Sequence, residues 1–269
     1  MRIFIITMDD PIQTKNFIKY IIQKKNNNII GLAVPDGDRL TLSKGKSKYA
    51  YLLSLLLIMG PYHFCKNVFV SVFHKFKKKA HKFKLCKDPT IIGYAKENNI
   101  PTYKIKTPNS KKFREELMKI QPDIIINQSQ NIIKKELLDI PTIGVINRHN
   151  ALLPKNRGRL TPFWVIFKEE KETGVSIHFV EEGLDSGKII VQKKYRVEKN
   201  DNFNSLVKKN YKIAPKAMIE ALELLENNQK DFIDNDDELA TYNTTPTIKE
   251  AFYYRYKQLI SILNKLKFL

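Results

Sequence analysis

Asn147, His149 and Asp185 have the side-chain types and spacing of a site that stabilises negative charge on an oxygen. His149 can act as a general acid or, once protonated, as a cation beside developing negative charge. Asn147 precedes it by two residues, so on a strand both side chains point the same way and the amide can donate to the same oxygen. Asp185 can keep His149 charged and accept a proton from an attacking amine. Together they suit a reaction in which an amine attacks while a neighbouring oxygen gains negative charge.

Each of these residues has a plainer explanation when it is taken alone. A histidine that follows a strand is more often structural than catalytic. An aspartate before Ser-Gly, as in Asp185-Ser186-Gly187, is more often part of a turn. The functional interpretation therefore depends on the combination of all three residues.

The elements that must position these residues alternate between buried strands and amphipathic helices. Strands are expected at residues 3–7, 29–34, 102–105, 124–126, 144–147, 174–180 and 189–192. Helices are expected to begin near residue 10 and to span residues 89–98, 110–119, 134–138, 163–168, 203–225 and 248–268. This alternation predicts an α/β fold with a doubly wound, mostly parallel sheet. His149 would then follow a strand at the carboxyl edge, where ligands bind in such sheets.

The sequence predicts one catalytic domain over residues 1–225, interrupted by a helical insertion at about residues 44–87. Within the insertion, residues 49–59 are almost wholly apolar, whereas residues 64–83 mix Phe and Val with Lys. These patterns predict one helix that is apolar nearly all round and a second that is amphipathic and basic. Residues 226–269 are expected to form a short C-terminal helical extension and not a full domain.

The chain of 269 residues has a formal net charge of +19, and eleven lysines without any acid lie in residues 44–87. This charge suits an acidic partner such as nucleic acid, an anionic membrane surface or a phosphorylated substrate. A Lys-rich composition inherited from an AT-rich genome explains it equally well.

Cys65 and Cys86 have the spacing of neither a disulfide framework nor a metal site. The N-terminal apolar run is too short for a signal peptide, so a cytoplasmic protein is expected.

Three ordered sequence blocks resemble the formyltransferase family, which includes methionyl-tRNA, glycinamide ribonucleotide and sugar N-formyltransferases. The blocks read INRHNALLPKNRG followed by TPFW, then ETGVSIHFVEEGLDSGKIIVQ, and, more weakly, QPDIIINQSQNIIKKELLDIP. They match the family's Asn-x-His, Leu-Leu-Pro and Arg-Gly, its Gly-Val-Thr-x-His and Leu-Asp-x-Gly, and its Pro-Asp strand. The resemblance covers about residues 1–225 apart from the insertion, and ordered blocks are far more specific than a lone motif.

The resemblance implies that Asn147, His149 and Asp185 are the catalytic residues of a folate-dependent formyl transfer. It implies 10-formyltetrahydrofolate as the formyl donor, without a metal, bound between residues 127–132 and 181–185. The implied donor-binding residues are Asn127, Gln128, Ser129, Gln130, Glu182, Gly183 and Leu184.

For the acceptor, the resemblance implies contacts from Asn150, Arg157 and His178. His178 can equally be structural, and Arg157 can cap a carbonyl in a tight loop instead of binding an acceptor phosphate.

The acceptor expected from these motifs is a small phosphorylated amine, namely a nucleotide-linked amino sugar. Many family members have Pro-Ser where this chain has Asn150 and Ala151, and HN-x-x-LP-x-NRG is more similar to the sugar N-formyltransferases. The tRNA enzymes carry a β-rich C-terminal domain, whereas a loop and a helix are expected here after residue 225. Methionyl-tRNA is therefore the second expectation, and an inactive binding homologue the third.

Residues 49–83 are expected to contact an anionic membrane surface from the cytoplasmic side without crossing it. The apolar run of residues 49–59 is too short to span a bilayer, and the Phe and Lys of the second helix suit an interface. A helix that covers the sheet or joins two copies in a homodimer is the alternative. His63, His74 and His81 are expected to lie on a solvated face.

Overall fold

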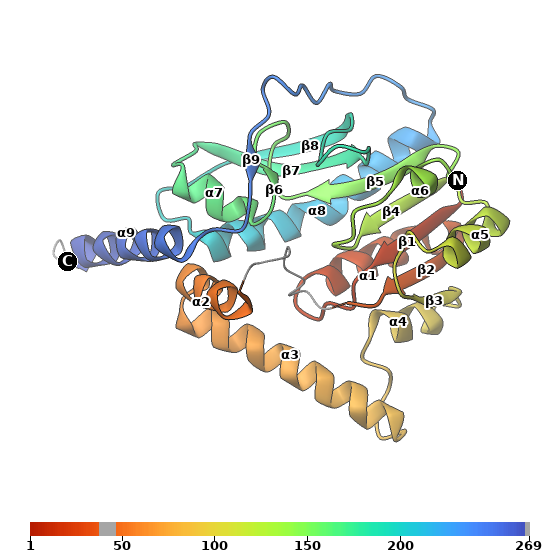
Figure 1. The fold of residues 1–269 in the computed structure, drawn as a ribbon, viewed down its shortest axis with the longest axis horizontal. Coiled ribbons are helices and arrows are strands. Elements are labelled where there is room, and N and C mark those ends of the chain that lie inside the picture. Colours follow the sequence, from red (N-terminus) through yellow and green to blue (C-terminus); the bar gives the residue numbers. More distant parts are fainter. Residues whose placement is uncertain (38–46, 267–269) are drawn as a thin grey trace.

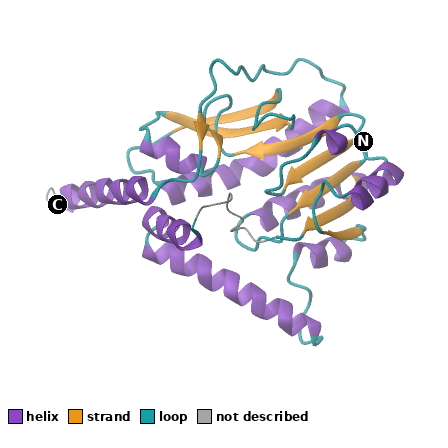
Figure 2. Ribbon diagram, viewed as in Figure 1, coloured by secondary structure: helices purple, strands orange, loops and turns teal. Residues whose placement is uncertain are grey.

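The computed structural model describes residues 1–37 and 47–266. Its centre is a seven-stranded sheet with the order β3-β2-β1-β4-β5-β7-β8 (Figures 1 and 2). These strands are β1 (Ile3–Thr7), β2 (Ile29–Pro35), β3 (Thr102–Ile105), β4 (Ile124–Gln128), β5 (Gly144–His149), β7 (Glu172–Phe179) and β8 (Ile189–Arg196). Strands β1 to β5 pair in parallel, whereas β7 pairs antiparallel with β5 and with β8. The predicted α/β fold with a mostly parallel sheet is confirmed.

Helices lie on both faces of this sheet, and a short pair of strands lies outside it. The helices are α1 (Thr14–Lys25), η1 (Asn26–Asn28), α2 (Lys48–Met59), α3 (Pro61–Lys82), α4 (Ile91–Glu97), α5 (Lys111–Ile120), α6 (Lys135–Leu138), α7 (Thr161–Phe167), α8 (Phe203–Glu226) and α9 (Ile248–Leu266). The pair is formed by β6 (Arg157–Gly158) and β9 (Tyr242–Asn243), which run parallel.

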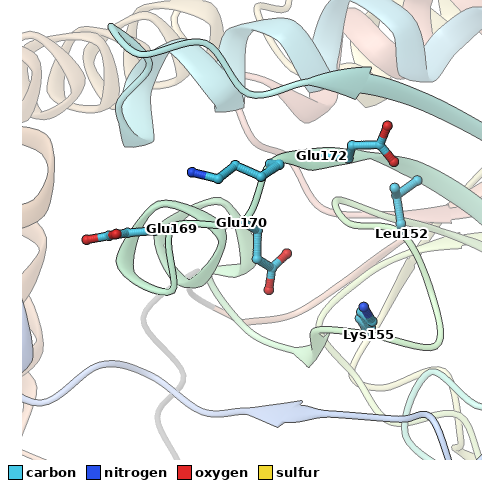
Figure 3. Close-up of a pocket in the computed structure, with 6 residues that line it drawn as sticks. Leu152, Lys155, Glu169, Glu170 and Glu172 are labelled. Atoms are coloured by element: carbon cyan, nitrogen blue, oxygen red, sulfur yellow. The ribbon is translucent and has the colours of Figure 1, made fainter.

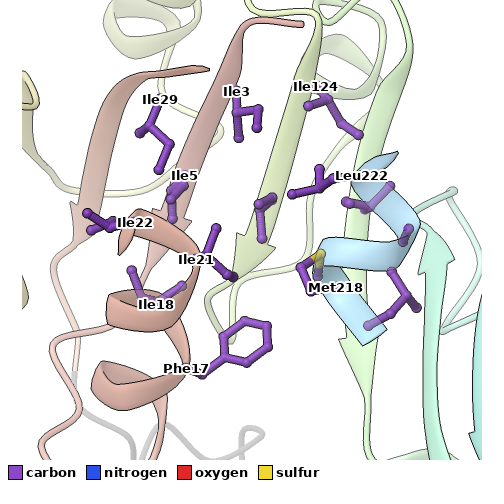
Figure 4. Close-up of a cluster of buried hydrophobic side chains, with 14 of the residues drawn as sticks. Ile3, Ile5, Phe17, Ile18, Ile21, Ile22, Ile29, Ile124, Met218 and Leu222 are labelled. Carbon is purple, nitrogen blue, oxygen red and sulfur yellow. The ribbon is translucent and has the colours of Figure 1, made fainter. Parts of the chain in front are cut away.

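The strands are apolar on both sides because both faces of the sheet are covered. All five residues of β1 are buried. On one face Ile3 packs in a cluster with Phe17 of α1 and Met218 of α8 (Figure 4). On the other face Phe4 packs against Phe113 of α5, with the two rings 5.9 Å apart. The two layers hold β4 and β5 rigidly, and these strands carry the polar residues of interest.

The helical insertion consists of α2 and α3, which lie between β2 and α4 (Figure 1). Residues 44–46 of the expected insertion lie outside the described part of the chain. The boundary that we placed at residue 225 remains a prediction.

Helix α2 is covered by the C-terminal part of the chain. Its Ile58 packs in one cluster with Phe163 of α7 and Tyr254 of α9. The Arg255 guanidinium donates to the carbonyl of Leu57 at 2.7 Å and to that of Ile58 at 3.0 Å. These two carbonyls belong to the last turn of α2, whose acceptors lack partners within the helix. The C-terminal end of α2 thus packs internally, whereas Tyr49 and Leu53 of the same helix are exposed.

Helix α3 is joined to the end of β1 through Asp9. The carboxylate accepts from Nε2 of His74 at 3.1 Å and from Nζ of Lys78 at 2.9 Å, both on α3. It also accepts from the main-chain N–H of Ile91 at 3.2 Å. Burial raises the pKa of Asp9, but the bonds from His74 and Lys78 outweigh burial and lower it to about 2. The expectation that His74 lies on a solvated face was therefore wrong, because its ring is buried against Asp9.

Candidate active site

Three neighbouring strands bring polar side chains into one row across the sheet. In the strand register Asn127 of β4 is opposite Asn147 of β5, and Asn147 is opposite His178 of β7. Residues opposite each other in a sheet point to the same face. His149 follows on that face at the last position of β5. The sheet therefore gathers these side chains at the carboxyl end of β5.

Asp185 reaches this row from the loop that follows β7. Its Oδ2 lies 3.5 Å from Nδ1 of His149, and its Oδ1 lies 3.8 Å from Nε2 of His178. Oδ2 also accepts from the main-chain N–H of Gly158 at 2.9 Å. The φ angle of Asp185 is +51°, which an L-residue adopts only at some cost in free energy. The structure thus brings Asp185 and His149 together.

The two ring nitrogens of His149 both face acceptors. Nε2 lies 2.8 Å from the carbonyl oxygen of Asn156, which can only accept, so Nε2 carries a hydrogen. Nδ1 faces the Asp185 carboxylate. The doubly protonated ring is the form that satisfies both neighbours, and its charge would lie beside the row of polar side chains.

His178 is held in the neutral form beside the same carboxylate. Its Nδ1 donates to the carbonyl of Phe179 at 2.7 Å, so a neutral ring has its lone pair on Nε2. Burial lowers the pKa of His178 to about 4, outweighing the nearby Asp185 carboxylate, which acts to raise it. Nε2 is buried and has no hydrogen-bond partner among the described residues. It is therefore an acceptor directed towards Asp185.

The amide of Asn147 is oriented by its neighbours. Its Oδ1 accepts from Nε2 of Gln128 at 2.7 Å and from the N–H of Arg148 at 2.8 Å. Oε1 of Gln128 in turn accepts from Nε of Arg148 at 3.0 Å, which fixes the direction of the Gln128 amide. Because the Asn147 oxygen is engaged twice, its NH2 group is the half that can donate to a substrate.

Arg148 is a residue that we did not expect in this site. Its guanidinium lies 4.3 Å from the ring centre of Tyr211 on α8 and 5.1 Å from that of Phe17 on α1. These contacts hold the side chain on the opposite face of the sheet from Asn147, from where it bonds Gln128. The only sequence signal for it is an arginine where a buried strand would otherwise carry an apolar residue.

The residues expected at the donor site belong to two loops. Asn127 is buried, and its Oδ1 accepts from the N–H of Ser129 at 3.1 Å and from its Oγ at 2.8 Å, which makes a tight turn. Gln128 is turned inwards to Asn147, whereas Gln130 is exposed. In the second loop Glu182, Gly183 and Leu184 are exposed, as is Glu181.

Of the residues expected to contact the acceptor, Arg157 is completely buried and Asn150 is half-buried. The guanidinium of Arg157 donates to Asp237, to the hydroxyl of Tyr242 and to Asn235, all in the segment between α8 and α9. These contacts leave Arg157 unavailable to a substrate, which corrects our expectation of a binding role.

The other two residues expected to contact the acceptor are Asn150 and His178. Oδ1 of Asn150 accepts from Nη1 of Arg148 at 2.8 Å. His178, as described above, faces Asp185. Both therefore remain candidates for contact with an acceptor.

Asn235, which lies in the C-terminal extension, holds the loop that carries Asp185. Its Nδ2 donates to the carbonyl of Asp185 at 2.8 Å and to that of Gly187 at 2.9 Å, while Oδ1 accepts from Arg157. Because residues 227–238 are mostly polar, no pattern in the sequence distinguishes Asn235.

The pairing of β6 with β9 closes the extension over the site. A Cβ atom on Gly158 would lie 2.1 Å from the carbonyl oxygen of Asn243, and the φ angle of Gly158 is +104°. Only glycine fits this position. The same Gly158 donates its N–H to Asp185, so the extension and the loop that carries Asp185 meet at one residue.

A hollow of about 350 Å³ lies beside this network (Figure 3). Its described lining residues are Leu152, Lys155, Glu169, Glu170, Lys171 and Glu172. Glu170 accepts from Nδ2 of Asn156 with both oxygens at 2.9 Å. The carbonyl of Asn156 in turn accepts from His149. Asn156 therefore lies between the hollow and the candidate catalytic residues Asn147, His149 and Asp185.

Within residues 1–37 and 47–266, no group of three or more His, Cys, Asp or Glu side chains is arranged so that it could hold a metal ion. The arrangement instead offers hydrogen-bond donors at Asn147 and His149 and acceptors at Asp185 and His178. Such a set can stabilise negative charge on one atom and take a proton from its neighbour.

Solved structures similar to this chain include members of two groups of formyl-transferring enzymes. An N-formyltransferase from Helicobacter canadensis, solved with folinic acid and dTDP-3-aminofucose, superposes with a TM-score of 0.56 and 19% identity. The match covers 91% of this chain and 71% of that one. A phosphoribosylglycinamide formyltransferase from Anaplasma phagocytophilum superposes with a TM-score of 0.59 and 14% identity over 90% of this chain and 98% of that one. At these identities the likeness shows a shared fold.

Sequence comparison gives the family directly. The methionyl-tRNA formyltransferase of Kosmotoga olearia is 31% identical over 192 residues, which are 71% of this chain and 61% of that protein. This chain spans about half to three fifths of the length of the curated relatives that it matches. The family model described as "Formyl transferase" matches residues 62–222, which is more than half of the chain. The chain therefore belongs to the formyl transferase family.

Proposed function

We propose that this protein transfers a formyl group from 10-formyltetrahydrofolate to a primary amine. The observation that carries the proposal is the fixed orientation of Asn147. Its oxygen is held by Gln128 and by the Arg148 N–H, so its NH2 group is left to donate on the face of the sheet that also carries His149. Two donors at one point of the sheet edge suit an oxygen that gains negative charge as an amine attacks a formyl carbon.

In this proposal the donor supplies an activated formyl carbon, and the chain supplies the charge stabilisation. Asn147 donates through Nδ2 to the formyl oxygen. His149, positively charged between the Asn156 carbonyl and the Asp185 carboxylate, lies next to the same oxygen. Because both groups are held by buried or half-buried neighbours, little reorganisation is needed during the reaction, which is how such donors lower a barrier.

Asp185 is the group that takes the proton from the attacking nitrogen. Its Oδ2 is engaged by His149 and by the Gly158 N–H, which leaves Oδ1 on the side of His178. His178 is neutral and its Nε2 can only accept, so it supports a proton on Oδ1. The amine would then lose its proton to a carboxylate that lies beside a second acceptor. The bond between the formyl carbon and N10 of the donor would break, and N10 would take up one proton as tetrahydrofolate leaves.

The two loops assigned to the donor each present an exposed apolar side chain. Ile132, which follows the turn of Asn127 and Ser129, is 79% exposed, and Leu184 is 55% exposed. Apolar side chains at the mouth of a polar site suit a flat heteroaromatic ring such as the pteridine of a folate. The donor-binding role of both loops rests on this fit and on the family's motifs.

For the acceptor, we propose a nucleotide-linked amino sugar. The motif HN-x-x-LP-x-NRG supports it, as does the likeness to the Helicobacter canadensis N-formyltransferase, which covers 91% of this chain. A small phosphorylated amine is also compatible with the net charge of +19.

The proposal is tested by incubating the purified protein with 10-formyltetrahydrofolate and a panel of nucleotide-linked amino sugars, dTDP-3-aminofucose among them. The expected result is a product that is heavier by one formyl group, together with release of tetrahydrofolate. The variant Asn147→Asp is the matched negative control. If neither the sugars nor any other primary amine is formylated, the assignment of formyl transfer is wrong.

Charged initiator tRNA is the second candidate acceptor. It is supported by the 31% identity to a methionyl-tRNA formyltransferase and by the basic character of the chain. The same assay with methionylated initiator tRNA separates the two. Formylation of the tRNA well above that of every amino sugar would reverse the order.

A further inference from the structure

The outward face of α3 is a continuous stripe of exposed apolar side chains. Phe69, Phe76 and Phe83 are each about two thirds exposed, at 68%, 66% and 68%. We define the α3 stripe as Tyr62, Cys65, Phe69, Val72, Phe73, Phe76 and Phe83, all of them exposed. The helix has 22 residues and is therefore about 33 Å long.

The spacing of the α3 stripe places it on the side of the helix opposite the protein. Its members recur at intervals of three, four and, up to Phe83 directly after the helix, seven residues, which keeps them on one side of an α-helix. The other side carries Asn67, His74 and His81. Asn67 contacts Met59 and His74 binds Asp9, so this side docks on the protein. Figure 1 shows α3 along the periphery of the molecule. The stripe is therefore not part of the internal packing.

Lysines flank the α3 stripe along both of its edges. By the helical period, Lys66 and Lys77 lie on one edge and Lys75 and Lys79 on the other, and all are exposed. Nζ of Lys77 lies 4.7 Å from the ring centre of Phe73. The sequence has no acidic residue between residues 44 and 87. The face thus combines aromatic rings with uncompensated positive charge.

This composition selects among the possible occupants. Lysine is depleted at protein–protein interfaces. A second copy of this helix would place lysines against lysines with no carboxylate from α3 between them. An interface between headgroups and acyl chains, by contrast, takes up aromatic side chains while anionic headgroups pair with the lysines.

We propose that the α3 stripe lies on an anionic lipid surface, with its rings among the acyl chains and its lysines at the headgroups. The contact is assigned to α3 and not to α2, whose C-terminal end packs internally against α7 and α9. None of the helices in the described ranges is long and apolar enough to cross a membrane. The contact is therefore peripheral, and it would hold the enzyme beside amines made or consumed at that surface.

The test is co-sedimentation of the full chain with extruded vesicles at low salt. Vesicles of phosphatidylcholine are compared with vesicles that contain about one third phosphatidylglycerol. Binding to the anionic vesicles alone is expected, and it should weaken as salt is raised because the charges are screened. Failure to bind anionic vesicles at low salt overturns the proposal.

A first pair of double variants tests whether vesicle binding depends on the α3 stripe or on exposed apolar side chains in general. Phe69→Gln with Phe76→Gln should weaken binding at least about tenfold. Met118→Gln with Leu239→Gln, which removes two exposed apolar side chains elsewhere, should leave it unchanged. Equal losses from both pairs would overturn the assignment to α3.

A second pair of variants tests the charge. Lys75→Glu with Lys79→Glu should weaken binding by more than about tenfold. Lys112→Glu with Lys119→Glu on α5 changes the net charge by the same amount and should have a much smaller effect. The residues substituted in the four double variants are all exposed, so each variant is expected to keep the unfolding midpoint of the native protein.

Other occupants give different results in the same experiments. If the protein is a dimer that Phe69→Gln with Phe76→Gln converts to monomers, the α3 stripe is a contact between copies. If Lys75→Glu with Lys79→Glu abolishes binding to bulk tRNA while anionic vesicles are not bound, the surface recognises RNA. Either result overturns the lipid assignment. None of the measurements uses the formyl-transfer reaction, so their outcome is independent of the proposed activity.

Discussion

The side chain of Asn235 donates to the main-chain carbonyl of Asp185 at 2.8 Å, although fifty residues separate the two in the sequence. A second bond from the same amide group reaches the carbonyl of Gly187. Asp185 has a positive φ angle, a conformation that persists only where neighbouring groups enforce it. The segment after α8 thus fixes the position of a candidate catalytic carboxylate.

We therefore predict that Asn235→Leu lowers kcat by about ten- to a hundredfold while KM for both substrates changes little. The variant removes both bonds to the Asp185 loop without touching a substrate. Steady-state kinetics of the formyl-transfer assay measure the effect. Asp234→Asn, at the neighbouring exposed position, is the control and should behave like the native protein. An unchanged kcat in Asn235→Leu would show that the loop holds its own geometry.

Asn147→Asp is predicted to lower kcat by about 10²–10³-fold. The carboxylate still accepts from Gln128 and from the Arg148 N–H, so the fold is preserved, but the NH2 group that faces the substrate is lost. The unfolding midpoint should stay close to that of the native chain. Activity within a few-fold of the native level would exclude Asn147 as an oxyanion donor.

The depressed pKa of His178 predicts a dependence of stability on pH. In the folded protein it titrates at about 4, against an ordinary value of 6.5. Between these values the unfolded chain binds a proton that the folded chain does not, so stability falls as the pH is lowered from 6.5 towards 4. The contribution is at most about 1.4 kcal/mol per pH unit.

Urea denaturation at several pH values measures this slope. His178→Asn should flatten it over that range, because the titrating ring is removed while an amide can replace the Nδ1 donor. His63→Asn, on the exposed start of α3, is the matched control. Equal slopes in native protein and His178→Asn would contradict a neutral buried ring.

Treatment with a chelator should leave formyl transfer unchanged, because the proposed mechanism assigns every charge and proton to side chains of this chain. The assay is repeated after dialysis against EDTA, with native protein kept in plain buffer as the control. Lost activity that returns on addition of zinc or magnesium would require a metal in the mechanism.

Much of the fold was predictable from the sequence because the sheet is covered on both faces. The apolar run of residues 3–7 matches the bounds of β1. A strand that is buried on both faces is apolar along its whole length, so the run begins and ends with the strand. The direction of β7 and β8 was not specified by the sequence, because a short apolar strand reads the same in a parallel or an antiparallel pair.

The contacts that complete the site were less accessible to sequence reasoning. Asn147, His149 and Asp185 stood out by their types and by family motifs, and their catalytic roles remain predictions. Asn235 and Arg148 act through partners far away in the chain, at separations that no local period encodes. His74 was misjudged for the same reason, since its partner Asp9 lies 65 residues away.

The contact between Arg255 and the last turn of α2 has a consequence for how the chain is made. The carbonyl of Leu57 leaves the ribosome 198 residues before the guanidinium that binds it. Through most of synthesis the apolar α2 has no α9 to cover it, so it stays a candidate for chaperones and for association between nascent chains. Helix α9 thus completes the packing of the first insertion helix, and a chain that ends before residue 248 lacks the contacts of α9 with α2.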